Sequence, residues 1–513
     1  MNFQRKLIAF ATAFFTAISL CAATVASQPG QLAQAITDHS ITSLKVTGEM
    51  DARDFKFIAD NLAQLSELDL SETAIKAYAD AENPLFGTDN HFPEAAIPAS
   101  AFFGMPLTKV VLPVNLQVIG YAAFAGCRNL TEISFPTTLD SIGAYAFSST
   151  ALTAVSIPAS VRIVGEGAFS RCNSLATAHV ASAVIQKDAF AVDTALTTLS
   201  LGKEVKTIGD GAFKSCSALT AINFTGSSIT SVGEEAFAHT ALAVVDLTAQ
   251  VSLSSVSDWA WANTPVAEAK LPKNLTSLGE GVFFYASELQ KAELPASLTS
   301  VPAFTFAGAT ALTTDTIIPA EATEVGNYAF YNASSLNHFV IPQKVQRIGA
   351  QAMAGTTGLQ TMKVCTSFVP ALEDSVWAGV NQPEVKVSLA HPTLTADFRL
   401  ADQWKNFHIL QNFFLGDTNT DGEIDVTDVS LLISYVLSGE ATGINLQVAD
   451  VDQNGNIDVA DASLIINMVL TDSKTIIQLH PAGKTVVGNI PSVTNATADI
   501  ITDAATAGVA TLK

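Results

Sequence analysis

The stretch that decides the fold is Leu130-Thr-Glu-Ile-Ser-Phe-Pro136, followed directly by Thr137-Thr-Leu-Asp-Ser-Ile-Gly143 and Ala144-Tyr-Ala-Phe147. In its first part, apolar residues alternate with polar ones until a proline ends the run, which predicts a short strand with one buried face. The second part predicts another extended piece that ends in a glycine turn. The last part is a tight segment that we expect to turn the ring of Phe147 inward.

The same pattern recurs along the chain, with an aromatic residue as its usual marker. The markers are Phe102, Phe124, Phe147, Phe169, Phe190, Phe213, Phe237, Trp261, Phe283, Phe306, Phe330, Met353 and Trp377. The interval between consecutive markers is nearly constant along the whole series. A nearly fixed period over so many copies predicts a solenoid, because one unit cannot bury its apolar face alone and stacked neighbours cover one another.

The repeating unit has a recognisable consensus. It reads Leu-x-x-Ile-x-(Ile/Phe/Leu)-Pro, then Ile-Gly-x-x-Ala-Phe, then a cysteine three residues on, and it resembles the BspA-like leucine-rich repeats of bacterial surface proteins. The cysteine position holds Cys127, Cys172 and Cys216 in three copies, and Thr150, Thr240 or Ala286 in others. The resemblance implies a repeat solenoid of short parallel β-strands with turns, whose surface binds a partner.

The resemblance also divides the chain. Residues 96–410 are expected to form the repeats, with a closing cap near Ala401–Phe407. Residues 28–95 are expected to form the N-terminal cap of the solenoid, with strand-like pieces at Leu44–Val46 and Leu68–Leu70.

The repeat spacing indicates whether the cysteines of the repeats can form disulfides. Cys127 and Cys172 lie two repeats apart, and so do Cys172 and Cys216. With stacked strands ~4.8 Å apart, two repeats separate such residues by about 10 Å, whereas a disulfide tolerates roughly 7 Å between Cα atoms. We therefore expect small buried thiols in one column of the core.

Two acidic segments near the C-terminus repeat each other, the first beginning at Asp417 and the second at Asp450. Their candidate metal ligands are Asp417, Asn419, Asp421, Glu423, Asp425 and Asp428, then Asp450, Asp452, Asn454, Asn456, Asp458 and Asp461. These residues hold loop positions 1, 3, 5, 7, 9 and 12, and position 7 offers its backbone carbonyl. Position 6, where the loop must bend sharply, is Gly422 or Gly455. Oxygen atoms in this pattern suit a hard cation, so the sequence predicts two Ca²⁺ sites.

Each acidic loop runs into an apolar segment that predicts a helix. The apolar faces are expected to be Val429, Leu432, Ile433, Val436 and Leu437, then Ala462, Ile465, Ile466, Val469 and Leu470. Two such loop–helix repeats with Asp at position 12 resemble a type I dockerin-like module over residues 411–471. The resemblance implies a small all-α calcium-binding domain that docks into a cohesin-type domain. It also implies that loop positions 10 and 11 help to choose the partner; here they are Val426-Thr427 and Val459-Ala460, where a Ser-Thr pair is common.

The first residues have the layout of a secretory signal peptide. Arg5 and Lys6 precede an apolar run from Leu7 to about Val25, which ends among small residues. We predict a signal peptide over residues 1–27, cut near Ala26, and a secreted or cell-surface protein that does not span a membrane in its mature form.

Two alternatives stay open at this end of the chain. The apolar run is almost long enough to act as an uncleaved anchor. Cys21 is a candidate for lipid attachment, although Leu20 stands where a small residue is preferred. At the other end, residues 472–513 form a tail of unknown role, with strand-like pieces at 475–479 and 485–487.

Composition and motifs exclude several functions. The net charge of −22 disfavours nucleic acid as a partner. The eight histidines show no zinc spacing, and neither a nucleophile elbow nor a His-Glu-x-x-His motif is present. A pair of glycosidase carboxylates is not excluded by spacing alone, but the repeats occupy the length that a catalytic barrel needs. We therefore expect no enzyme.

Three interpretations follow. The repeat surface recognises another surface protein, a host protein or a glycan, as in adhesion. Alternatively, the chain is a non-catalytic component of an extracellular polysaccharide-degrading complex, held there through a cohesin-type domain. In the third, the calcium module only stabilises the end of the fold.

Overall fold

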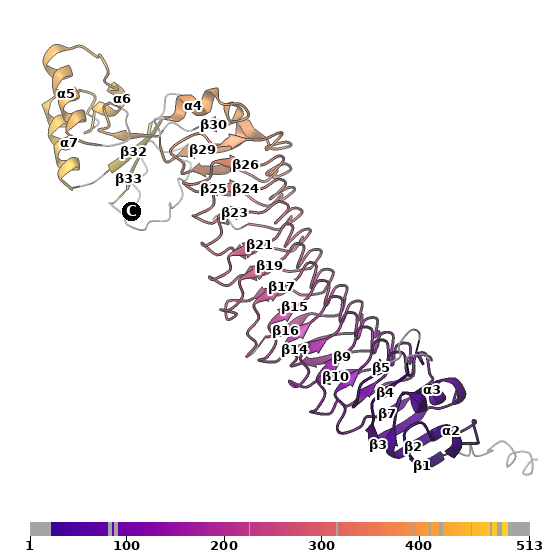
Figure 1. Cartoon of the computed structure of the whole chain (residues 1–513). Coiled ribbons are helices and arrows are strands. Elements are labelled where there is room, and N and C mark those ends of the chain that lie inside the picture. The colour runs from indigo at the N-terminus through magenta and orange to yellow at the C-terminus, as the bar shows by residue number, and fades with distance from the viewer. Residues whose placement is uncertain are drawn as a thin grey trace, which may run out of the picture. The chain divides into compact units, whose positions relative to one another are not determined.

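The computed structural model describes residues 22–80, 85–86, 91–224, 226–313, 317–391, 394–409, 412–419, 424–452, 454–471, 474–479 and 485–490. The chain divides into two compact units, of which the first ends at Leu289 and the second begins at Gln290. Figure 1 colours the chain by residue number, and each unit is described by itself. Most of the predicted signal peptide (1–21) and the end of the tail (491–513) lie outside the described residues.

The first unit opens with a parallel sheet of longer strands. Its elements are β1 (Ala22–Ser27), α2 (Leu32–Ala35), β2 (Ser43–Met50), α3 (Ala52–Asn61), β3 (Glu67–Ile75) and β7 (Lys109–Val111). The strand order is β1-β2-β3-β7, and the strand-like pieces expected at 44–46 and 68–70 lie within β2 and β3. A short antiparallel pair, β4 (Tyr78–Ala79) and β5 (His91–Phe92), follows β3.

Strand β1 consists of residues that the sequence assigned to the signal peptide. All six of its residues pair in parallel with β2, from Ala22 opposite Ser43 to Ser27 opposite Gly48. A cut near Ala26 would remove most of this strand and expose the edge of β2. We therefore propose that processing occurs before Ala22.

The carboxylate of Asp54 ties the start of the chain to α3. It accepts hydrogen bonds from the backbone N–H groups of Gly30 and Leu32, both at 2.8 Å, and from that of Asp51 at 2.9 Å. The last bond belongs to a capping box that begins α3. Burial raises the pKa of Asp54.

Most repeats of the first unit contribute short strands to two parallel ladders. One is a nine-stranded sheet of β6 (Ala96–Ile97), β8 (Val118–Ile119), β9 (Ser141–Ile142), β11 (Ile163–Val164), β13 (Val184–Ile185), β15 (Thr207–Ile208), β17 (Ser231–Val232), β19 (Ser255–Val256) and β21 (Ser277–Leu278), which pair in this order (Figure 1). The other ladder holds β10 (Ala154–Ile157), β12 (Thr177–Val180), β14 (Thr198–Leu201) and β16 (Ala221–Asn223). A separate sheet then begins, in which β18 (Val244–Asp246) pairs with β20 (Glu268–Lys270).

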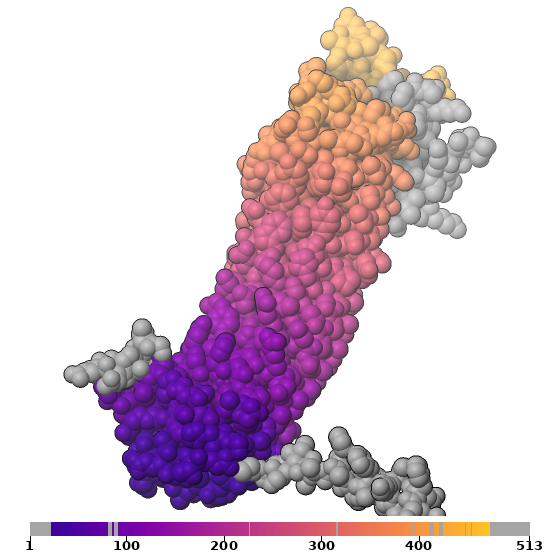
Figure 2. Space-filling view, turned by 90° about the vertical axis from the view of Figure 1, so that its right-hand side faces the viewer, coloured from indigo at the N-terminus to yellow at the C-terminus, as the bar shows by residue number. Residues whose placement is uncertain are grey.

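The core of this unit is a column of stacked rings. The rings from Phe102 to Phe283 lie with successive centroids 5.1 to 6.0 Å apart, and their side chains are buried. The prediction of a repeat solenoid with an inward aromatic in each copy is therefore confirmed. The space-filling view shows successive coils of this unit closed against each other on the face it presents (Figure 2).

The turn that carries each ring needs left-handed backbone at two places, two residues before the ring and two residues after it. Around Phe147 these are Tyr145 and Ser149, with φ of 56° and 59°. Around Phe169 they are Gly167 and Arg171, with φ of 56° and 61°. Non-glycine residues adopt this conformation at a cost, so the stacking of neighbouring coils must hold it in place.

The cysteines of the repeats are free thiols, as the spacing predicted. Cys127, Cys172 and Cys216 are buried, and each Sγ donates a hydrogen bond of 3.1 Å to the carbonyl oxygen of a marker phenylalanine.

The second unit continues with repeats. Its elements up to residue 409 are β22 (Lys291–Glu293), β23 (Ser300–Val301), β24 (Glu324–Val325), β25 (His338–Ile341), β26 (Arg347–Ile348), β27 (Thr361–Val364), β28 (Ala371–Leu372), η1 (Gln382–Glu384), β29 (Lys386–Leu389), α4 (Thr395–Leu400), η3 (Trp404–Asn406) and β30 (His408–Ile409). Two parallel sheets run through them, in the orders β23-β24-β26-β28 and β25-β27-β29-β30. The expected closing residues include Trp404, which is buried, contacts Trp377, Phe398 and Phe407, and donates its indole N–H to the carbonyl of Pro370 at 3.0 Å.

The C-terminal part of this unit is helical. It contains β31 (Asn412–Leu415), α5 (Val426–Ser438), α6 (Leu446–Ala449), α7 (Val459–Thr471), β32 (Lys474–Leu479) and β33 (Thr485–Ile490). The three strands form an antiparallel sheet in the order β31-β32-β33. The tail pieces expected to be strands lie in β32 and β33, so the helices are flanked by a small sheet that we did not predict as a unit.

Candidate metal centre

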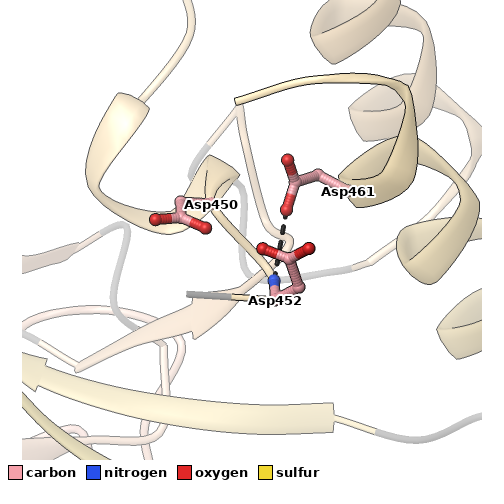
Figure 3. A group of neighbouring side chains, drawn as sticks. All are labelled: Asp450, Asp452 and Asp461. Carbon is pink, nitrogen blue, oxygen red and sulfur yellow. Dashed lines mark hydrogen bonds between the residues drawn. The ribbon is translucent and has the colours of Figure 1, made fainter. Parts of the chain in front are cut away.

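The second acidic loop gathers three carboxylates. Asp450, Asp452 and Asp461 each place one oxygen so that all three lie within 4.8 Å of one another (Figure 3). Asp461 comes from the first turn of α7, and the other two precede it in the loop. Calcium–oxygen distances of roughly 2.3–2.6 Å allow two oxygens on one ion to be about 5 Å apart, so the three carboxylates fit a single Ca²⁺ ion.

Backbone hydrogen bonds shape this loop. Asp461 is fully buried, and it accepts the N–H groups of Val451 at 2.6 Å, Asp452 at 3.1 Å and Asp458 at 2.9 Å. Gly455 supplies the sharp bend, with φ of 89°, and donates its N–H to Asp450 at 2.9 Å. The chain thus holds the carboxylates close together through its own backbone.

The other predicted ligands of this loop lie at its rim. Asn454 donates its side-chain amide to Asp452 at 2.7 Å and accepts the backbone N–H of Asn456 at 2.8 Å. Asp458 accepts the N–H of Ala460 at 2.7 Å at the start of α7. Asp458 is therefore a helix cap, and it lies outside the group of three carboxylates.

The first loop is described in part. Asp417 and Asp428 are buried, whereas Asp421 and Glu423 lie outside the described residues. Asp425 caps α5 by accepting the N–H of Thr427. Its hydrogen bonds with the side chain of Thr427 and then with this backbone group lower its pKa.

The described bonds of the two loops match at corresponding positions. Asp428 accepts the N–H groups of Asn419 at 3.1 Å and Asp425 at 2.9 Å. Asp461 holds the corresponding N–H groups of Asp452 and Asp458 at 3.1 and 2.9 Å. The two loops therefore share one frame around their last carboxylate.

The helices that follow the loops pack against each other through a small core. Its buried members are Leu415, Ile424, Leu432, Ala449, Val451, Ala462 and Ile465. This packing keeps each final carboxylate fixed in the first turn of its helix, where it also suits the helix dipole.

The sequence prediction was wrong about part of each helix. Among the residues expected on the buried faces, Leu432 and Ile465 are buried, but four others are exposed. Together with the valines at loop position 10, these four form three pairs, here called the apolar pairs, with one member of each pair in each loop–helix repeat. Their exposed fractions are 69% and 67% for Val426 and Val459, 42% and 44% for Ile433 and Ile466, and 82% and 79% for Leu437 and Leu470. The spacing of 429, 432, 433, 436 and 437 fits one broad apolar face, so the sequence alone contained no signal that Ile433 and Leu437 lie at its exposed edge.

Comparison with known families agrees with this structure. The profile of the BspA type leucine rich repeat region matches residues 95–191, 183–313 and 254–381, so the chain belongs to that family. The profile of the dockerin type I domain matches residues 415–470. A comparison with curated protein sequences finds no match.

A solved structure supports the repeat fold. A leucine-rich repeat protein from Bacteroides ovatus aligns with 75% of this chain and 91% of its own, with a TM-score of 0.53 and 20% identity. A leucine rich cell surface protein from Faecalibacterium prausnitzii aligns with 56% of this chain and 92% of its own, with a TM-score of 0.33 and 22% identity. At 20% identity the likeness to the Bacteroides ovatus protein concerns the fold alone. Within the described parts of the chain, every helix is too short or too polar to cross a bilayer.

Proposed function

We propose that this chain is an exported, non-catalytic binding protein that docks to a cohesin-type partner through its calcium-loaded dockerin module. The observation that carries the proposal is the duplicated loop frame, in which Asp428 and Asp461 hold corresponding backbone groups. The cluster of Asp450, Asp452 and Asp461 supports calcium as the ion, since hard oxygen ligands are those that Ca²⁺ prefers. Both kinds of module are typical of extracellular or surface-attached proteins.

The apolar pairs are the surface that we assign to docking. In the free module, Val426, Leu437 and their counterparts are exposed to water. A partner that covers these side chains removes apolar surface from water, which favours binding. Their exposures are nearly equal in the two halves, so each half presents a similar apolar surface. Since these contacts involve no charged group, we expect binding to depend little on salt.

The repeats supply the second half of the function. We infer that they recognise a protein or glycan while the dockerin module retains the chain in an assembly. The alternative is a non-catalytic component of a polysaccharide-degrading complex, in which the module is the decisive part and the repeats act as a spacer.

The test is binding of the immobilised full chain to a panel of purified cohesin domains, in calcium and in EGTA. We expect at least one cohesin to bind in calcium only. The double variant Val426→Asp/Val459→Asp should abolish that binding. The matched control is Ser434→Asp/Asn467→Asp, which adds the same charges at exposed polar positions of the same helices and should bind normally. Calcium binding without capture of any cohesin would contradict the docking role and leave the module structural.

A further inference from the structure

Asn454 and Gly455 form the only Asn-Gly pair in the sequence, and they lie in the second acidic loop. Both residues are exposed, and a Cβ atom added to Gly455 would meet nothing within 4 Å. The backbone nitrogen that follows Asn454 therefore carries no side chain that would shield it. In such a pair an asparagine side chain is readily attacked by the backbone nitrogen of the next residue, with loss of its amide.

Each group that would react has a hydrogen-bond partner inside the loop. The N–H of Gly455, the attacking group, is donated to Asp450 at 2.9 Å. The amide nitrogen of Asn454, the leaving group, donates to Asp452 at 2.7 Å. The carbonyl oxygen of Asn454 accepts the N–H of Asn456 at 2.8 Å, which draws electrons from the carbon under attack. Two of these three partners, Asp450 and Asp452, are carboxylates that we assign to the ion.

The ion therefore governs how firmly the reacting groups are held. The carboxylate oxygens of Asp450, Asp452 and Asp461 lie within 4.8 Å of one another (Figure 3), where like charges repel. A bound Ca²⁺ ion cancels this repulsion, and the carbonyl oxygen of Asn454 at loop position 5 is one of its expected ligands. Without the ion the carboxylates move apart, and the groups that they hold become free to meet.

We propose that Asn454 is a deamidation site that bound calcium protects, so that a second loop without its ion converts Asn454 to aspartate and isoaspartate. This inference rests on the calcium sites of the proposed function. It adds that a module left without calcium loses its second site irreversibly.

The reaction needs only water as a co-reactant. The backbone nitrogen of Gly455 gives up its proton and bonds to Cγ of Asn454. The bond from Cγ to Nδ2 breaks, and the side-chain nitrogen takes up a proton and leaves as ammonia. Water then opens the resulting succinimide ring at either of its two carbonyl carbons. One opening gives aspartate, and the other gives isoaspartate, in which the main chain runs through Cγ.

The two products differ in what they do to the loop. The first loop has Asp421 and Gly422 at the corresponding positions, so the aspartate product reproduces a residue that the other loop already uses. Isoaspartate lengthens the main chain by one atom just before the sharp bend at Gly455, where φ is 89°, and shortens the arm that carries the carboxyl group. We therefore expect isoaspartate to destroy the site and aspartate to preserve it.

The test is incubation of the full chain at neutral pH, in calcium and in EGTA, followed over time by peptide mass spectrometry. With a dissociation constant of about 10 µM and about 1 mM calcium, about one loop in a hundred is free. Asn454 should therefore deamidate about a hundredfold more slowly in calcium than in EGTA. Asn456 is the internal control, because it is exposed in the same loop but is followed by the branched residue Ile457, and it should stay unmodified.

Calcium titration before and after the incubation in EGTA measures the consequence. The wild type should fall from two ions per chain toward one as isoaspartate accumulates. Asn454→Gln keeps an amide oxygen but must close a larger ring, so incubation should leave its titration unchanged. Freshly prepared Asn454→Asp should bind two ions, because Asp421 holds this position in the first loop.

Three results would overturn the proposal: no modification of Asn454 in EGTA, equal rates in calcium and EGTA, or two ions still bound by a chain that carries isoaspartate at this position. Each leaves the docking role intact if the fresh chain binds a cohesin in calcium only. A fresh chain that binds calcium but no cohesin contradicts the docking role and leaves the deamidation site intact.

Discussion

The indole ring of Trp259 lies directly over Gly281 in the next repeat, so that a Cβ atom added to Gly281 would come within 2.2 Å of the ring. A Cβ atom added to Gly167 would likewise come within 2.4 Å of the ring of Tyr145. Gly281 and Gly167 hold the left-handed position before the core aromatic, with φ of 58° and 56°. In these repeats glycine is required both by backbone conformation and by the side chain of the preceding coil.

Substitution of Gly281 should therefore destabilise the fold by more than the cost of its left-handed backbone conformation alone. Gly104→Ala is the control, because Gly104 has φ of 71° with nothing within 4 Å of an added Cβ. We expect Gly104→Ala to lose about 1–2 kcal/mol, and Gly281→Ala to lose about 1–3 kcal/mol more through displacement of the indole. Urea unfolding measures both, and equal losses would show that the ring moves away freely.

A second prediction concerns Asp193, which is fully buried. One oxygen accepts the N–H of Cys172 at 2.7 Å, and Oδ2 has no partner within the described residues. Burial raises the pKa of this carboxyl well above its usual value of 3.8. Above pH 3.8 the folded state holds a proton that the unfolded state releases. The free energy of unfolding is therefore unaffected by Asp193 below pH 3.8, and it falls as pH rises from there toward the pKa of Asp193 in the folded state.

Asp193→Asn should remove that fall. The amide keeps an acceptor for Cys172 and has no charge to bury. Burial raises the pKa of the Cys172 thiol to about 12, so that thiol does not titrate in the range. We expect the stability of the variant relative to wild type to increase between pH 4 and pH 7, measured by urea unfolding at each pH. A constant difference across this range would refute a protonated Asp193.

The N-terminal strand gives a third prediction. A chain that begins at Ala22 should be more stable than one that begins at Gln28, because removing β1 leaves the edge of β2 unpaired. Thermal unfolding of the two chains tests this. Mass spectrometry of exported protein should find the mature N-terminus at or before Ala22, and a terminus near Ser27 would restore the cut predicted from the sequence.

Calcium should stabilise the helical region. If each site binds calcium with a dissociation constant of about 10 µM, about 1 mM calcium raises the free energy of unfolding by about 2.7 kcal/mol per site. Circular dichroism should show helix loss in EGTA, arising from α5 and α7. Identical spectra and thermal midpoints in calcium and EGTA would refute the assignment of Asp450 and Asp461 as ligands.

The sequence predicted what depends on periodicity. The spacing of residues such as Phe147 and Phe169 predicted the solenoid, since period alone decides which side chains meet in a stack. The loop pattern predicted Asp450, Asp452 and Asp461 as neighbours, because a bend at Gly455 brings them together.

Other features depend on contacts that the pattern does not encode. The exposure of Leu437 and Leu470 follows from how α5 and α7 pack, and an apolar run does not reveal which of its residues stay outside. The pairing of β1 with β2 was hidden because its residues, Ala22–Ser27, also fit the end of a signal peptide. The ladder of β10, β12, β14 and β16 ends before β18, and the repeat pattern, which continues through both coils, does not encode this break.

The measurement that tests the central claim most directly is calorimetric titration of calcium into the metal-free full chain, with Asp450→Asn beside the wild type. The account predicts two ions per wild-type chain, one per variant chain, and helix gained as each loop fills. No binding heat for the wild type, or the same stoichiometry for both proteins, would contradict it.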